Sequence, residues 1–121
     1  MRFMMFIKHL EDYYGRDVPA GLFAAMDELV EENTKKGVLI DTAGLQPLAK
    51  STRIRLAGGK IQVTDGPFTE SKEVVGGYAL CEIATHDEAV AFATKFMDVH
   101  RIHWPEFEGE VEVRPLETGA P

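Results

Sequence analysis

The segment from Arg2 to His9 is apolar at both alternating sets of positions, with Phe3, Met5 and Ile7 on one side and Met4 and Phe6 on the other. Successive side chains of a strand point to opposite faces of its sheet. A strand that is apolar on both faces is expected to be covered on both. The pattern predicts a central strand.

Two segments have the spacing of amphipathic helices. Between Ala20 and Lys36, apolar residues recur at every third or fourth position, acidic residues precede the final lysines, and Gly37 is a natural stop. From Thr85, the sequence Thr-His-Asp-Glu is a capping box, and an apolar stripe follows it. We predict one helix in each segment.

The remaining apolar segments predict strands. Residues 52–56 and 61–63 flank Gly58-Gly59, which is a hairpin signal, and the arginines of this hairpin should line its polar face. Gly76-Gly77 suggests a bulge, or the close approach of another group, in a long strand. One expected strand begins at residue 38, and a loop that could fold over another part of the chain or a ligand follows it. The other expected strands span 52–56, 61–63, 74–83 and 110–114.

Without the hairpin, this order is strand, helix, strand, strand, helix, strand. It predicts an α+β, ferredoxin-like split βαβ arrangement in which two helices cover one face of an antiparallel sheet, with an extra hairpin. The other face needs a cover as well, and the simplest is the sheet of an identical chain. We therefore expect a homodimer. Each chain should contain one domain, residues 1–116, and a flexible tail, residues 117–121.

Composition excludes several classes of protein. The 121 residues are 45% hydrophobic and 27% charged, which fits one globular domain. A net charge of −7 makes nucleic acid an unexpected partner. The apolar start is too short for a signal peptide or a membrane span, and Cys81 suits a small buried hydrophobe, so we expect a cytoplasmic protein. No nucleotide fingerprint or phosphate-binding loop is present, and no cofactor is expected.

The most specific stretch runs from Val63 to Tyr78 and concentrates charges beside a Gly-Pro turn. Asp65 can accept hydrogen bonds from following amides, Gly66 permits an unusual backbone dihedral angle, and Pro67 fixes the local backbone. A purely structural turn explains these three residues as well as a ligand site does. Glu70, Lys72 and Glu73 hold acid and base close together, which suits proton transfer, although surface ion pairing is the commoner arrangement. This loop is the candidate site.

Other candidates lie near the loop or near the second helix. Lys8 ends an otherwise apolar strand face and must reach solvent or pair with a carboxylate, Asp65 or Glu73 being the specific candidates. His9 is an acid/base candidate because histidine is the side-chain type that changes charge nearest neutral pH. His100 and His103 have a metal-like spacing, but Pro105 interrupts the helix and no metal site is predicted.

The motif Val63-Thr-Asp-Gly-Pro-Phe-Thr-Glu-Ser-Lys-Glu73, followed by Gly76-Gly-Tyr78, resembles the signature of DGPF-domain proteins in the YCII-related family. The resemblance implies a ferredoxin-like chain that forms a dimeric α+β barrel. The family is mostly uncharacterised, and some members resemble a dehydrochlorinase with a proposed His/Asp pair. Residues 20–36 contain no histidine, so that pair is not carried over. The resemblance also suggests a link to alternative sigma factors.

Two functions remain open. The first is a small-molecule-binding protein, with a pocket bordered by the loop and the first strand, that acts as a lyase or isomerase by proton transfer. Asp65 or Glu73 would be the base and Lys72 an electrostatic stabiliser. The second is a non-catalytic binding or regulatory module that engages another protein, with the loop as a structural clasp. The expected ligand-binding residues are Lys8, His9, Phe68, Glu70 and Tyr78.

Overall fold

The computed structural model describes residues 1–10, 13, 16–68 and 73–117. Glu70 and Lys72, and most of the expected tail, lie outside the described residues. The elements follow in the order β1 (Arg2–Leu10), α1 (Ala20–Lys35), β2 (Leu39–Gly44), the 3₁₀ helix η2 (Leu48–Lys50), β3 (Thr52–Ala57), β4 (Lys60–Asp65), β5 (Glu73–Glu82), α2 (His86–His103) and β6 (Gly109–Pro115).

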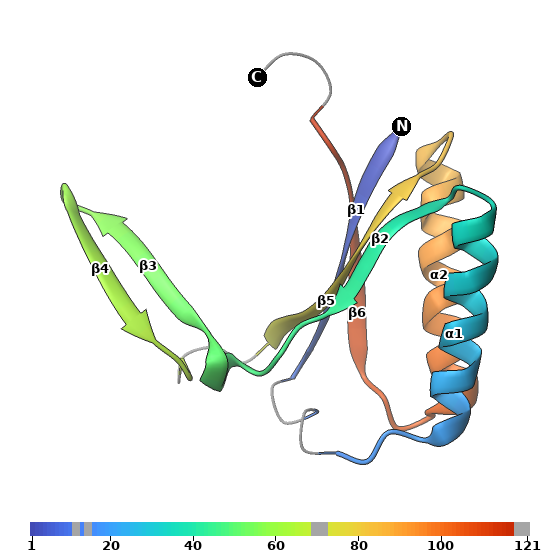
Figure 1. The fold of residues 1–121 in the computed structure, drawn as a ribbon, viewed down its shortest axis with the longest axis horizontal. Helices are drawn as coiled ribbons and strands as arrows, with labels where there is room; N and C mark the ends of the chain where they lie inside the picture. Colours follow the sequence, from blue (N-terminus) through green and yellow to red (C-terminus); the bar gives the residue numbers. More distant parts are fainter. Residues whose placement is uncertain (11–12, 14–15, 69–72, 118–121) are drawn as a thin grey trace.

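Four strands form one antiparallel sheet in the order β2-β5-β1-β6, and β3 and β4 form a separate two-stranded sheet. Both helices cover the same face of the four-stranded sheet (Figure 1). The α+β class and the split βαβ order with an extra hairpin are confirmed. The central position expected for the first strand is confirmed as well, because β1 lies between β5 and β6.

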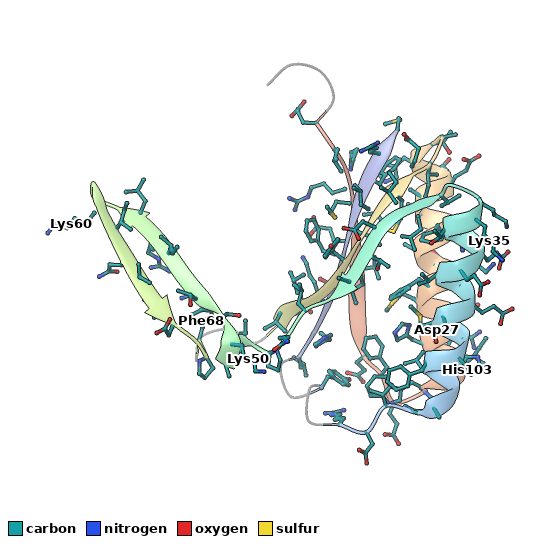
Figure 2. All side chains as sticks on the ribbon, in the orientation of Figure 1. Asp27, Lys35, Lys50, Lys60, Phe68 and His103 are labelled. Atoms are coloured by element: carbon teal, nitrogen blue, oxygen red, sulfur yellow. The ribbon has the colours of Figure 1, made fainter. Side chains whose placement is uncertain are left out.

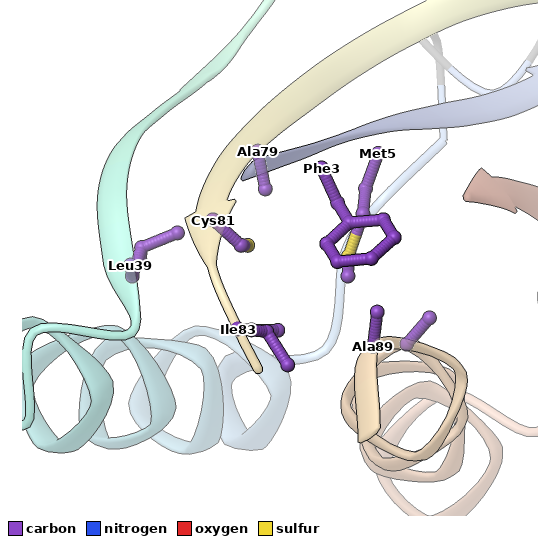
Figure 3. Packing of buried hydrophobic residues seen from close by; sticks show 8 residues of the cluster. Phe3, Met5, Leu39, Ala79, Cys81, Ile83 and Ala89 are labelled. Atoms are coloured by element: carbon purple, nitrogen blue, oxygen red, sulfur yellow. The ribbon is translucent and has the colours of Figure 1, made fainter. Parts of the chain in front are cut away.

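The core lies between this sheet and the helices. The register sets Phe3 opposite Cys81 and Met5 opposite Ala79, so these four side chains share the face that α2 covers, where Ala89 meets them (Figure 3). Burial removes water from around the Cys81 thiol and raises its pKa to about 11. Cys81 is therefore a small core hydrophobe, as its sequence context suggested.

Local signals set the helix ends. Gly37 has φ +73 just beyond α1, a conformation that glycine adopts without strain. The Oγ of Thr85 accepts a hydrogen bond from the amide of Glu88 at 3.1 Å, which confirms the predicted cap of α2. Neither helix of the described chain is long and apolar enough to cross a membrane.

The sheet face that points away from the helices is the open face. Its middle is apolar, with half-buried Met4, Phe6 and Leu80 on neighbouring strands, and Lys8 and Tyr78 lie on the same face. Among the described residues, no helix or strand packs over it (Figure 1).

The glycine pair in β5 behaves as expected. The pairing of β1 with β5 shifts between Ile7 and Lys8, which leaves Gly76 as the extra residue of a bulge. A Cβ on Gly76 would lie 1.9 Å from the Nε2 of His9. Gly76 therefore lies in a bulge and is also closely approached by another group, which is the His9 side chain of the same chain.

Candidate functional site

The end of the hairpin is tied back to its beginning. Asp65, the last residue of β4, accepts a hydrogen bond from the hydroxyl of Thr52 at 3.0 Å. One residue later, the amide of Gly66 donates to the carbonyl of Ser51 at 2.8 Å. Because one Asp65 carboxylate oxygen already has a partner within the hairpin, the geometry gives Asp65 a structural role.

Glycine is required at position 66 for a reason that differs from the expected one. The turn was expected to need an unusual dihedral angle, but the glycines with positive φ in the described chain are Gly37, Gly58 and Gly59. A Cβ on Gly66 would instead lie 1.9 Å from the carbonyl oxygen of Leu48. The backbone after β4 thus passes too close to η2 for any side chain.

A cleft of about 480 Å³ lies at the base of the hairpin, where the loop that follows β2 meets β3 and the start of β5. We call it the hairpin-base cleft. Its volume is in the range that small-molecule sites occupy. The residues that line it are Leu45, Gln46, Pro47, Leu48, Lys50, Ser51, Arg53, Phe68, Glu73, Val74 and Val75.

The cleft combines cations, an aromatic ring and a carboxylate. The guanidinium carbon of Arg53 lies 4.0 Å from the centre of the Phe68 ring, a cation–π distance. Figure 2 shows Phe68 and Lys50 together at the foot of the hairpin. Glu73 places a carboxylate in the same lining, and Val74 and Val75 supply an apolar wall. Such a site can hold a small anion that has an apolar part.

The structure brings the predicted site residues together only in part. Phe68 and Glu73 line the hairpin-base cleft, whereas Asp65 is hydrogen-bonded to Thr52 at the point where the end of the hairpin meets its beginning. Tyr78 lies on the open face, where its hydroxyl donates to the Oδ2 of Asp41 at 2.8 Å. This hydrogen bond raises the pKa of Tyr78, so the phenol stays protonated at neutral pH.

Lys8 has a different partner from the two suggested by sequence. Its Nζ donates to the Oε1 of Glu112 at 2.8 Å, and Arg114 pairs with the other oxygen of that carboxylate. The hydrogen bond to Glu112 raises the pKa of Lys8, and the charges of Glu110 and Glu73 act in the same direction. Lys8 is a positive charge held on the open face. The pairing depends on the register of β1 with β6, which the sequence does not disclose.

His9 lies beside a second, smaller hollow of about 260 Å³. Its Nδ1 lies 2.7 Å from the carbonyl oxygen of Leu10, and its ring meets Tyr13 edge-on with 5.7 Å between centroids. Glu73 lines this hollow as well as the hairpin-base cleft. Of the predicted acid and base candidates, His9 and Glu73 are therefore neighbours. The hollow is lined by His9, Leu10, Glu73, Glu108, Gly109 and Glu110.

The two histidines of α2 have separate environments. His100 is buried, with its Nδ1 3.0 Å from the carbonyl oxygen of Phe96, and burial lowers its pKa. His103 is exposed. Within the described ranges, three or more histidine, cysteine or acidic side chains nowhere gather in an arrangement that could hold a metal ion.

Sequence reasoning missed the cationic side of the cleft. Arg53 was expected to face solvent on the hairpin, and Lys50 was not singled out. The available signal was the loop around Pro47, which was expected to fold over something; η2 within it lines the cleft through Leu48 and Lys50.

Comparison with known proteins agrees with the motif. The model of the YCII-related domain matches residues 1–100. An uncharacterised protein of Rhizobium meliloti (strain 1021) is 36% identical over 80 residues, which are 66% of this chain and 60% of that protein. The aligned part thus spans about 60% of the relative's length. A family match over most of the chain, together with the motif and the observed strand order, shows that this chain belongs to the YCII-related domain family.

Proposed function

We propose that this chain is a small-molecule-binding protein whose ligand occupies the hairpin-base cleft. The observation that carries the proposal is the Arg53 guanidinium stacked on Phe68 in the lining of a cleft that also contains Lys50 and Glu73. Two cations favour an anionic group on the ligand, and a guanidinium can bind a carboxylate with two hydrogen bonds. Phe68 and the valine wall favour an apolar or aromatic body. The ligand class is therefore a small organic carboxylate.

If the protein is an enzyme, the geometry favours proton transfer with Glu73 as the base. Asp65 is engaged by Thr52, whereas Glu73 borders both the cleft and the hollow beside His9. The Glu73 carboxylate would take a proton from the carbon next to the ligand's carboxylate and return it at another carbon, as in an isomerase. Lys72, the stabiliser expected from sequence, lies outside the described residues.

The test compares two arginines of one strand. Saturation-transfer NMR against a panel of aliphatic and aromatic carboxylates should identify a ligand. Arg53→Gln should then weaken its binding by about 10-fold or more, because hydrogen bonds to charged groups contribute about 1.5–3 kcal/mol. Arg55→Gln is the matched control, since Arg55 lies two residues along β3 and outside the described cleft lining. Equal binding to both variants, or no carboxylate binding to the wild type, would reject the proposal.

A non-catalytic binding or regulatory module is the second candidate. It is favoured by the exposed apolar face of the hairpin, which a ligand-binding enzyme does not need. Ile54, Leu56, Ile61 and Val63 share this face and are 66–72% exposed. Absence of any carboxylate binding in the same screen would favour this module.

A further inference from the structure

A further cleft, of about 420 Å³, lies where α2 ends and the chain turns into β6 (Figure 1). We call it the α2 cleft. Its volume is in the range of small-molecule sites, and it shares no described lining residue with the hairpin-base cleft. The residues that line it are Thr94, Met97, Asp98, His100, Arg101, Pro105, Phe107, Glu108 and Gly109.

His100 is the buried polar side chain of this cleft. It is 8% exposed, and its Nδ1 lies 3.0 Å from the carbonyl oxygen of Phe96. A carbonyl oxygen only accepts hydrogen bonds, so the proton of the neutral imidazole is on Nδ1 and Nε2 carries a lone pair. Burial lowers the pKa of His100, which keeps the ring in this neutral form at pH 7.

The Nε2 lone pair has no hydrogen-bond donor within the part of the chain that the structure describes. The two ring nitrogens point in nearly opposite directions, so an Nδ1 turned toward the α2 backbone directs Nε2 away from it. The ring packs against Phe96 and Phe107, with centroid distances of 4.6 and 4.8 Å, and these apolar rings supply no N–H or O–H. A buried acceptor without a partner costs free energy, so a donor that enters the cleft should bind there.

The charges of the lining favour a cation. Two carboxylates, Asp98 and Glu108, stand against the one guanidinium of Arg101. Arg101 donates to the Oδ1 of Asp98 at 2.7 Å, whereas no described side chain forms an ion pair with Glu108. The Phe107 ring adds an aromatic surface, which also attracts cations. Neutral His100 therefore offers its lone pair in a cleft of net negative charge.

We propose that the α2 cleft binds a small organic amine in its protonated form. One N–H of the ammonium group donates to the Nε2 of His100, the Glu108 carboxylate balances the charge, and the organic part lies against Phe107. A cation without an N–H cannot make the first of these contacts. The structure thus assigns His100 as a binding residue that distinguishes amines from quaternary ammonium ions.

The first test compares two cations that differ in their N–H groups. Benzylammonium has N–H donors, whereas benzyltrimethylammonium has the same charge and ring and no N–H. Each is titrated into the ¹⁵N-labelled wild-type chain at pH 7, and NMR follows the ring nitrogens of His100 and the amides of 94–109. Benzylammonium should shift these amides and the Nε2 resonance along one saturable curve, and benzyltrimethylammonium should leave the Nε2 resonance in place. An Nε2 resonance that benzylammonium does not move, or that both cations move equally, would overturn the proposal.

The second test uses the two histidines at the end of α2. His100→Gln should weaken benzylammonium binding by about 10-fold or more, measured by calorimetry, because a charged donor loses its acceptor. His103→Gln removes an exposed imidazole that lies outside the described lining, and it should leave the Kd unchanged. Equal Kd values for the two variants would contradict the assignment. Circular dichroism checks the fold, and if His100→Gln does not fold, the wild-type Nε2 resonance decides.

This amine site is independent of the carboxylate site. Arg53 lines the hairpin-base cleft, so Arg53→Gln should leave benzylammonium binding unchanged. A loss of benzylammonium binding in Arg53→Gln would place the amine in the other cleft and overturn the proposal.

Discussion

Single residues of this chain take their roles from what lies opposite them. Gly66 is glycine because the backbone carbonyl oxygen of Leu48 occupies the position of its Cβ, whereas a Cβ on Gly76 would displace the His9 ring. Asp65 illustrates the same dependence, since its Thr52 partner gives it a structural role. A charged residue in a distinctive motif is therefore assigned to chemistry only after its partners are known.

His100 should make stability depend on pH. Burial lowers its pKa in the folded chain, whereas the unfolded chain has the ordinary value of 6.5. Below pH 6.5 the unfolded state consequently binds more protons, and the free energy of unfolding falls until the pH reaches the folded pKa. This group contributes at most about 1.4 kcal/mol per pH unit. Urea unfolding at pH 7, 6 and 5 should show a shallower decline for His100→Gln than for the wild type.

His103→Gln controls for loss of an imidazole, because His103 is exposed on the same helix. Identical slopes for His100→Gln and the wild type would contradict the assignment to His100.

At the scale of elements, short-range signals determined where elements begin and turn. Gly58 and Gly59 have φ +57 and +73, the left-handed values that a tight two-residue hairpin turn requires. The capping box at Thr85 starts α2 in the same local way. Both features join residues no more than three apart, so they can be recognised without knowledge of the fold.

Removing the cap should measurably weaken the fold. Thr85→Ala leaves the Glu88 amide without its acceptor and should lower the free energy of unfolding by about 1 kcal/mol, measured by urea titration. Thr94→Ala is the matched control, because the Thr94 hydroxyl donates to the Val90 carbonyl inside the helix and caps nothing. A loss from Thr94→Ala as large as that from Thr85→Ala would show that the cap has no special value.

At the scale of the whole molecule, the hairpin β3–β4 and the four-stranded sheet are stabilised to different degrees. An isolated two-stranded hairpin is marginally stable in water, and the aliphatic face of this one is exposed. The four-stranded sheet, in contrast, is covered by two helices and contains the core. The four-stranded sheet and the hairpin should therefore differ in their local stability.

Hydrogen exchange measures this difference. Amides of the hairpin, residues 52–65, should exchange faster than amides of β1, because the two-stranded hairpin opens locally at a lower free energy than the centre of the four-stranded sheet. The β1 amides serve as the internal reference. Equal protection of the hairpin and β1 amides would contradict the expected difference.

By itself, the sequence determined the class of the fold, the order of its elements, the hairpin turn and the helix cap. Each depends on periodicity or on contacts between near neighbours, which the chain displays directly. It also located the distinctive loop, and the structure places Phe68 and Glu73 in the lining of a cavity.

Only the tertiary structure decided which residues share a site. Lys8 pairs with Glu112, 104 residues away, because β1 and β6 adopt one particular register. Arg53 reaches Phe68 because the chain that leaves the hairpin at Gly66 is hydrogen-bonded to Ser51 at the start of the hairpin. The cleft exists because the loop after β2 closes over the start of β5. Strand register and loop closure arise from the packing of the whole chain, so composition and spacing leave them undetermined.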